Sequence, residues 1–259
     1  MKCLYFIFIL FILSQASIFA DEYKETTFKD TNYRIYITDP LKIELYWKDK
    51  KTEKPLQRFS KVQAIIEAGG RKVVFMMNGG IFDQGNLLGL HIEDGAILNP
   101  LNLKDGDGNF YLKPNGVFFV DSDGKAGIME SNEYSKSNIQ PKIALQSGPL
   151  LVQNGKIHPK FDPASKNHKH RNGVGIGKDG KIVFAITETG EKQKKFPSLY
   201  DFSEFFLSLG CDNALFLDGD LSMMVVNPEG KIKDGNLLGA IIAVSEKNAK
   251  KVEEPDKAP

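Results

Sequence analysis

The stretch Asn213-Ala214-Leu215-Phe216-Leu217-Asp218-Gly219-Asp220-Leu221-Ser222 joins an apolar strand to a turn that carries two carboxylates and a hydroxyl. A second segment has the same local order, since Lys72-Val73-Val74-Phe75-Met76-Met77 leads into Asn78-Gly79-Gly80-Ile81-Phe82. Functional side chains gather on loops at the ends of buried strands, where a rigid scaffold meets a free backbone. The two turns therefore predict one site built from distant parts of the chain.

Each of these strands follows a predicted amphipathic helix that ends at glycine. The first helix starts at Ser60, which has capping-box spacing to Gln63, and ends at Gly69-Gly70. The second is capped by Ser198-Leu199-Tyr200-Asp201, which has the spacing of a capping box, and ends at Gly210. The shared order of helix, glycine, strand and turn is either a structural pseudo-repeat or a common local pattern.

Turn signals divide the rest of the chain into short strands. The alternating segment 33–47, with its turn at Asp39-Pro40, predicts a hairpin, and 87–130 predicts a β meander. Two further hairpins are expected around 153–156 and 177–180, and a closing strand over 237–244. We predict a single α+β domain with a β-rich, mixed or antiparallel sheet and two main helices, after Ser60 and after Ser198.

The two ends of the chain differ from its body. Residues 1–20 contain Lys2, a short apolar run and then smaller, more polar residues up to Ala20, which is typical of a secretory signal peptide. The apolar run is too short for a permanent membrane span. We expect a secreted or periplasmic protein with one folded domain over 21–246 and a disordered polar tail over 247–259.

Charge and cysteine content narrow the classes of partner. The 259 residues include 34 basic and 33 acidic side chains, and loss of Lys2 with the signal peptide would leave a formally neutral protein. A neutral protein is a poor ligand for nucleic acid or for a membrane surface, so neither partner is predicted. Cleavage also removes Cys3, so no intrachain disulfide is expected, and Cys211 is predicted to be a small buried hydrophobe. No pattern indicates a particular oligomeric state.

Asp218 is the strongest candidate for chemistry. It directly follows Leu215-Phe216-Leu217, so partial burial should raise its pKa and suit the carboxyl group to proton transfer, and Asp220 would act in the same direction. The alternative is an Asp-Gly turn in which the carboxylate only caps its own backbone.

The segment His168-Lys169-His170-Arg171-Asn172 concentrates basic and titratable side chains before a glycine-rich strand. Arg171 offers a planar fork for phosphate or carboxylate, and the histidines can exchange protons near neutral pH. The alternative is a solvated surface loop. No third ligand with zinc spacing accompanies the histidines, and Asp105–Asn109 lacks the later glycine and glutamate of a calcium loop, so no metal or other cofactor is predicted.

Four of these motifs, in this order, resemble the phosphodiester glycosidase family over roughly residues 72–244. They are Asn78-Gly79-Gly80-Ile81-Phe82, Ser147-Gly148-Pro149-Leu150-Leu151-Val152, Arg171-Asn172-Gly173-Val174-Gly175-Ile176 and the segment from Leu209-Gly210 to Ser222. The resemblance implies that residues 21–246 form a phosphodiester glycosidase-like domain. Such a domain is an exported α+β hydrolase that cleaves the bond between a sugar's anomeric carbon and a phosphate, with a carbohydrate or sugar phosphate as substrate.

The resemblance also implies roles for individual residues. Asp218, Arg171 and Asn78 would be catalytic, with Asp218 as base for water or as nucleophile and Arg171 stabilising the phosphate. The substrate-binding residues would be Gly79, Gly80, Phe82, Ser147, Gly148, His168, His170, Asp220 and Ser222.

One position departs from the family. Its usual Asp-Gly-Gly is Asp218-Gly219-Asp220 here, and the added carboxylate could bind a sugar hydroxyl, repel a phosphate or point to solvent. Two alternatives remain at this stage. One is a non-catalytic protein that binds glycans or sugar phosphates, and the other is an ordinary glycosidase with two carboxylates across a pocket.

Overall fold

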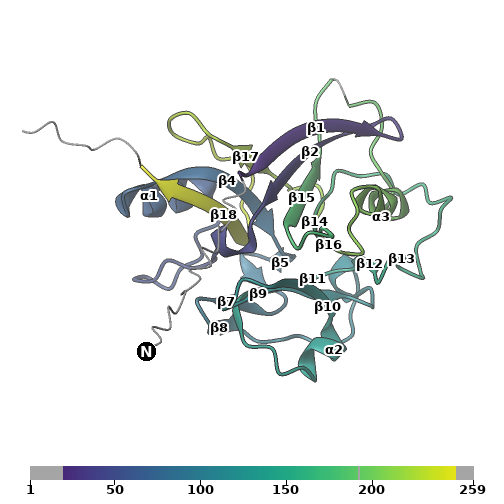
Figure 1. The fold of residues 1–259 in the computed structure, drawn as a ribbon, viewed down its shortest axis with the longest axis horizontal. Helices are drawn as coiled ribbons and strands as arrows, with labels where there is room; N and C mark the ends of the chain where they lie inside the picture. Colours follow the sequence, from purple (N-terminus) through teal and green to yellow (C-terminus); the bar gives the residue numbers. More distant parts are fainter. Residues whose placement is uncertain (1–19, 192, 249–259) are drawn as a thin grey trace, which may run out of the picture.

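Three antiparallel sheets and two ten-residue helices make up most of the computed structural model, which describes residues 20–191 and 193–248 (Figure 1). Every strand ladder among the described residues is antiparallel, so the predicted β-rich α+β class is confirmed with no parallel pairing.

The largest sheet has seven strands in the order β1-β2-β15-β14-β16-β12-β13. Their bounds are β1 (Glu22–Phe28), β2 (Thr31–Thr38), β15 (Ile182–Thr187), β14 (Asn172–Ile176), β16 (Asn213–Asp218), β12 (Leu150–Gln153) and β13 (Lys156–Ile157). The second sheet has the order β10-β9-β11-β7-β8. Its strands are β10 (Ala126–Glu130), β9 (Gly116–Asp121), β11 (Pro141–Ser147), β7 (His91–Glu93) and β8 (Ala96–Asn99).

The third sheet has four strands in the order β17-β4-β18-β3, and a two-stranded ribbon lies apart from it. The sheet consists of β17 (Met224–Val226), β4 (Arg71–Gly79), β18 (Ala240–Lys247) and β3 (Ile43–Tyr46), and the ribbon of β5 (Phe82–Asp83) and β6 (Asn86–Leu87). The helices are α1 (Phe59–Ala68), α2 (Ser131–Ser135) and α3 (Leu199–Ser208), with 3₁₀ turns at Pro40–Lys42 and Asn109–Tyr111.

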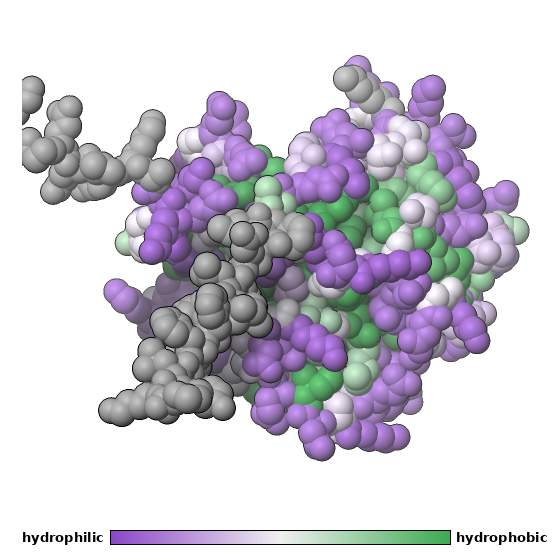
Figure 2. All heavy atoms as spheres, in the orientation of Figure 1, coloured by the Kyte–Doolittle hydropathy of each residue, from purple (hydrophilic) through white to green (hydrophobic). Residues whose placement is uncertain are grey.

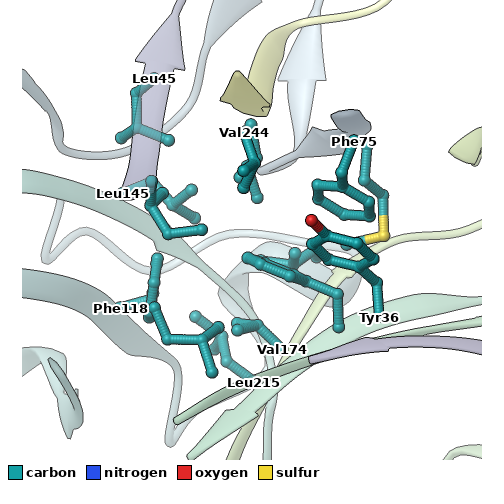
Figure 3. Close-up of a cluster of buried hydrophobic side chains, with 14 of the residues drawn as sticks. Tyr36, Leu45, Phe75, Phe118, Leu145, Val174, Leu215 and Val244 are labelled. Carbon is teal, nitrogen blue, oxygen red and sulfur yellow. The ribbon is translucent and has the colours of Figure 1, made fainter. Parts of the chain in front are cut away.

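The three large sheets turn one face each toward a common core. Figure 3 shows side chains from all three sheets converging there: Tyr36, Val174 and Leu215 from the first, Phe118 and Leu145 from the second, and Leu45, Phe75 and Val244 from the third. Burial of apolar surface is the main favourable term in folding, so this shared core joins the sheets into one domain.

The two longer helices cover the outer faces of two sheets. Phe202, Phe205 and Phe206 of α3 pack on the seven-stranded sheet. Val62 and Ile66 of α1 pack on the four-stranded sheet. Because the helices seal these faces, the ends of β4 and β16 are held in rigid, layered structure.

The N-termini of the two helices differ from each other. Ser198 and Asp201 form the predicted capping box at α3, with the Ser198 hydroxyl 3.0 Å from the Asp201 amide nitrogen. The box expected at Ser60 is wrong, because α1 begins at Phe59 and the Ser60 amide donates to Asp234 at 3.0 Å. Gln63 instead accepts from the Ile232 amide at 2.9 Å, so tertiary partners replace the local cap.

The hairpin expected over 33–47 is also wrong. β2 pairs with β1 and β15, whereas β3 pairs with β18 in another sheet. The turn at Pro40–Lys42 therefore carries the chain from one sheet to the next. Both segments alternate because each has one face in the common core, and alternation does not distinguish paired neighbours from strands of two sheets.

Other local expectations are confirmed at the level of hairpins. β12 pairs with β13, and β14 pairs with β15, as the turn signals predicted. The meander over 87–130 holds only in part, because β11 inserts between β9 and β7. Cys211 is fully buried, as expected, and burial raises the pKa of its thiol to about 12.

The predicted ends fall mostly outside the described residues. Residues 1–19 of the expected signal peptide and 249–259 of the expected tail lie there, whereas Lys247 is the last residue of β18. No helix in the described part of the chain is long and apolar enough to cross a membrane. Figure 2 shows hydrophilic side chains over most of one face, with apolar side chains visible between them.

Candidate functional site

The ends of β4 and β16 meet, although the two strands belong to different sheets. The side-chain amide of Asn78 donates to Asp218 Oδ2 at 2.7 Å. Asn78 is 1% exposed, so this contact between the two turns lies inside the protein. Two of the three residues predicted to be catalytic are therefore in direct contact.

Backbone groups determine which way the Asn78 amide points. The Met223 N–H can only donate, and it lies 2.8 Å from Asn78 Oδ1, so the nitrogen of the side chain must face Asp218. On the other side, Asn172 Nδ2 donates to the Asn78 carbonyl at 2.9 Å. The orientation of the donor toward Asp218 is thus set by fixed partners.

Asn172 is a site residue that the sequence reasoning missed. It is fully buried and pairs with Asp218 across the β14–β16 ladder. Its side-chain amide donates to both the backbone carbonyl and the side-chain oxygen of Asn78. Its place directly after Arg171, at the start of an apolar strand, is the signal that could have identified it.

The Asp218 carboxyl group has an unusual electrostatic environment. Burial raises its pKa from an ordinary 3.8 to about 6, and the neighbouring Asp220 carboxylate adds to the rise. Hydrogen bonds from the Gly219 amide to Oδ1, at 2.7 Å, and from Asn78 to Oδ2 oppose it. The group is mostly ionised at neutral pH but takes up a proton readily, which suits a base or nucleophile.

Arg171 is buried at 1% exposure, and its hydrogen bonds go to loop carbonyls and not to Asp218 or Asn78. Its Nε lies 3.1 Å from the Pro197 carbonyl and one terminal nitrogen lies 2.9 Å from the Asn167 carbonyl. The guanidinium carbon is 5.7 Å from the centre of the Phe216 ring.

No carboxylate among residues 20–191 and 193–248 forms an ion pair with Arg171. Burial lowers its pKa to about 10, so the side chain still carries a full positive charge at neutral pH. A buried cation without a bonded anion is costly. Arg171 is thus a buried cation whose hydrogen bonds go to backbone carbonyls and whose guanidinium lies over the Phe216 ring.

His170 is bonded to Ser222, and His168 directly follows Asn167, whose carbonyl binds Arg171. Both ring nitrogens of His170 already have protein partners, namely the Thr187 hydroxyl at 2.6 Å and the Ser222 carbonyl at 3.0 Å. The Ser222 hydroxyl and His168 Nδ1 are buried without a partner among the described residues. Ser222 precedes Met223 and so lies next to the Asn78 amide.

Ser147 and Gly148 hold the strand ends in place. The buried Ser147 hydroxyl donates to the Leu217 carbonyl at 3.1 Å, directly before Asp218. A Cβ at Gly148 would lie 2.6 Å from the Asn115 Cβ, so only glycine fits that contact. Both residues support the backbone around the carboxylate.

The turn after β4 has similar packing constraints. A Cβ at Gly79 would lie 2.8 Å from Ile242 Cδ1, and Gly80 has a φ of +80°, which favours glycine. Phe82 is half-buried and lies against Gly239, where a Cβ would be 2.8 Å from the Phe82 Cβ. The backbone of this turn is thus closely packed next to Asn78.

Asp220 points to the surface. Its side chain is 60% exposed and forms an ion pair with Lys169 at 3.0 Å. Of the three possibilities that the sequence left open for this carboxylate, the geometry matches orientation toward solvent, with Lys169 as partner.

Metal-ligating side chains are not clustered in the parts of the chain that the structure describes. No group of three or more histidine, cysteine, aspartate or glutamate side chains there could hold a metal ion.

Fold and site together define an antiparallel α+β protein in which a buried acid–amide pair lies at the ends of two strands from different sheets. The chain belongs to the phosphodiester glycosidase family, whose sequence model matches residues 71–250. The family implied by the sequence motifs is thereby confirmed.

Relatives in bacteria match over much of the chain. The uncharacterized protein YigE of Escherichia coli strain K12 is 37% identical over 185 residues, which cover 71% of this chain and 69% of that protein. The prophage-derived uncharacterized protein YomE of Bacillus subtilis strain 168 is 31% identical over 175 residues, 64% of this chain but only 26% of that protein.

Solved structures share the fold. The catalytic domain of zebrafish N-acetylglucosamine-1-phosphodiester alpha-N-acetylglucosaminidase, auto-inhibited by its pro-peptide, has a TM-score of 0.60 at 16% identity, covering 88% of this chain and 82% of that one. A putative exported protein of Burkholderia pseudomallei K96243 has a TM-score of 0.54 at 11% identity, covering 83% and 74%.

Proposed function

We propose that this protein hydrolyses the bond between a sugar's anomeric carbon and the phosphate of a phosphodiester in a glycan or glycoconjugate. The observation that carries the proposal is the Asn78–Asp218 hydrogen bond of 2.7 Å, which joins two family motifs around a carboxyl group whose pKa is raised to about 6. Membership of the family and the fold shared with the zebrafish enzyme support the same reaction class.

Asp218 is the group that acts on the anomeric carbon. In its ionised form it either takes a proton from the attacking water or bonds to the carbon itself, as carboxylates do in glycosidases. Water then supplies the hydroxyl of the free sugar, and the departing oxygen stays on the phosphate. Asn78 holds the carboxylate in place through a donor whose direction is fixed by Met223.

Arg171 is the residue that we assign to the phosphate. A phosphate monoester is a good leaving group, so the reaction needs stabilisation of negative charge more than a strong acid. The Arg171 guanidinium is charged, buried and without a bonded carboxylate among the described residues. Its bonds to the Pro197 and Asn167 carbonyls keep it in one orientation.

Export completes the proposal. Residues 1–20 have the pattern of a signal peptide, and we propose that the mature enzyme acts outside the cytoplasm on a glycan substrate. Fractionation of the host cell, with detection of the cleaved N-terminus by mass spectrometry, tests this part separately.

The test of activity uses an alkyl phosphodiester of N-acetylglucosamine 1-phosphate and follows release of the free sugar. Asp218→Asn is expected to lower kcat about 10²- to 10⁴-fold, the usual contribution of acid–base catalysis. Asp212→Asn is the matched control, because Asp212 is exposed and lies before the opposite end of β16. Equal turnover by Asp218→Asn and the wild type would refute the assignment.

Calorimetry with the same compound distinguishes an enzyme from a protein that only binds glycans. Hydrolysis gives continuing heat, whereas binding saturates. The solvent-facing Asp220, paired with Lys169, favours the enzyme, because its carboxylate leaves the Asn78–Asp218 contact intact. A saturating signal with no free sugar released would overturn the proposed function in favour of binding.

A further inference from the structure

His170 is a buried side chain whose two ring nitrogens are both bonded within the protein. It is 9% exposed, with Nε2 3.0 Å from the Ser222 carbonyl and Nδ1 2.6 Å from the Thr187 hydroxyl. A carbonyl oxygen only accepts, so Nε2 carries the proton. The Thr187 oxygen accepts the Arg171 amide at 3.1 Å, and its own hydrogen can go to Nδ1 at 2.6 Å or to the Arg171 carbonyl at 3.5 Å, of which Nδ1 is much the closer acceptor.

These bonds leave no ring nitrogen for a substrate. The Ser222 carbonyl, which can only accept, fixes the proton on Nε2, and the Thr187 hydroxyl occupies the other ring nitrogen, Nδ1. His170 thus connects β15, which carries Thr187, to the turn that follows β16. The His170 side chain therefore links these two elements through hydrogen bonds.

The segment to which His170 is hydrogen-bonded is the Asp218 turn, which we define as residues 219–223. The Ser222 amide bonds back to the Gly219 carbonyl at 2.9 Å, and the Met223 amide bonds to Asn78 Oδ1 at 2.8 Å. The Asp218 turn is therefore held at Ser222 by His170 and at the next residue by Asn78. The Gly219 amide, which donates to Asp218 Oδ1, begins the same turn.

We propose that His170 is a positioning residue, which holds the Asp218 turn to β15 so that Asp218 and Asn78 keep their relative geometry. This inference rests on the proposed function for its effect on turnover. It replaces the substrate contact that the sequence suggested for His170. A displacement of about 1 Å in a catalytic group can lower the rate about 10²-fold, so a side chain that holds this turn in place affects the rate without contacting the substrate.

The charges around His170 separate its role from that of Asp218. The charged groups that face His170 are the carboxylates of Asp220 and Glu188 and the guanidinium of Arg34. Burial has the largest effect on the ring, and it lowers the pKa of His170. Protonation at Nδ1 would leave the Nε2–H bond to Ser222 unchanged. The fall of activity at low pH is therefore expected to follow Asp218, and variants of His170 are expected to keep its midpoint.

Two substitutions separate the donor from the ring. His170→Phe fills the same space without a donor, whereas His170→Gln can place an amide N–H near the position of Nε2. We expect His170→Phe to lower kcat about 10- to 100-fold with KM changed less than about threefold, and His170→Gln to restore most of the loss. His158→Phe is the matched control, since His158 is also buried, at 4% exposure, but stacks on Phe161 away from this network.

Hydrogen exchange measures how strongly His170 stabilises the Asp218 turn, independently of activity. The amides of residues 219–223 are expected to exchange at least about tenfold faster in His170→Phe than in the wild type or in His158→Phe. A shifted midpoint of the low-pH fall, or a change in KM larger than that in kcat, would show contact with substrate and overturn the inference. Unchanged exchange in the Asp218 turn would overturn it as well. If the wild type releases no sugar, the proposed function fails, while the exchange experiment still decides whether His170 holds the turn.

Discussion

Replacing Asp218 by asparagine should change how the free energy of unfolding depends on pH. In the folded protein the carboxyl pKa is about 6, against 3.8 for an ordinary aspartate. Between these values the folded state binds more protons than the unfolded state, so stability falls as pH rises through this window. A difference of about 2 units corresponds to about 3 kcal/mol, which is lost in full above pH 6.

The asparagine side chain of this variant has no such titration, but its single oxygen can accept from only one of Asn78 and the Gly219 amide. Loss of one hydrogen bond costs about 1 kcal/mol at every pH. We therefore expect Asp218→Asn to be about 1 kcal/mol less stable than the wild type at pH 3.5 and about 2 kcal/mol more stable at pH 7.5.

Urea unfolding at half-unit steps from pH 3.5 to 8 measures this difference, since the titration of all other groups cancels between the two proteins. Asp212→Asn, which removes an exposed carboxylate near the same strand, is the control. A stability difference between Asp218→Asn and the wild type that stays constant with pH would refute the raised pKa, and with it the environment on which the catalytic role depends.

Three further predictions concern the supporting structure. Asn78→Leu removes a donor to the Asp218 carboxylate, so the midpoint of the low-pH fall of activity should move above pH 6, and an unmoved midpoint would contradict this prediction. The same substitution leaves the Met223 amide unpaired, which should lower the unfolding free energy measured in urea by about 1–3 kcal/mol. Ser198→Ala breaks the capping box with Asp201 and should lower stability by about 1 kcal/mol, whereas an unchanged unfolding midpoint would show that the cap is dispensable. EDTA should leave sugar release unchanged, because the proposed mechanism uses only Asp218, Asn78 and Arg171; loss of activity in EDTA that an added divalent cation restores would disprove this.

Local patterns in the sequence predicted the parts of the fold that depend on near neighbours. The helix after Ser198 was predictable because Ser198 and Asp201 satisfy each other's backbone groups within one turn. The helix after Ser60 was predictable as an element, but its cap was not, because Asp234 lies far along the chain and replaces the local partner. Long-range partners leave no signature in the spacing of neighbouring residues.

The same distinction applies to the site. Asp218 and Asn78 could be singled out because each follows a buried strand, and their motifs together indicated the family. Neither spacing nor composition shows that Asn172 lies between them, or that His170 turns both nitrogens to the protein. Those assignments need the β14–β16 register and the position of β15 beside β14.

The sequence by itself determined the α+β class, the two principal helices, the paired turns and the family, since hydrophobic periodicity, caps and motifs are local properties. Only the tertiary structure decided that β4 and β16, from different sheets, end against each other through Asn78 and Asp218. The physical reason is the shared core. Apolar faces of three sheets must be buried together, and that packing, which no local pattern encodes, places the two turns in contact and raises the pKa of the carboxyl group between them.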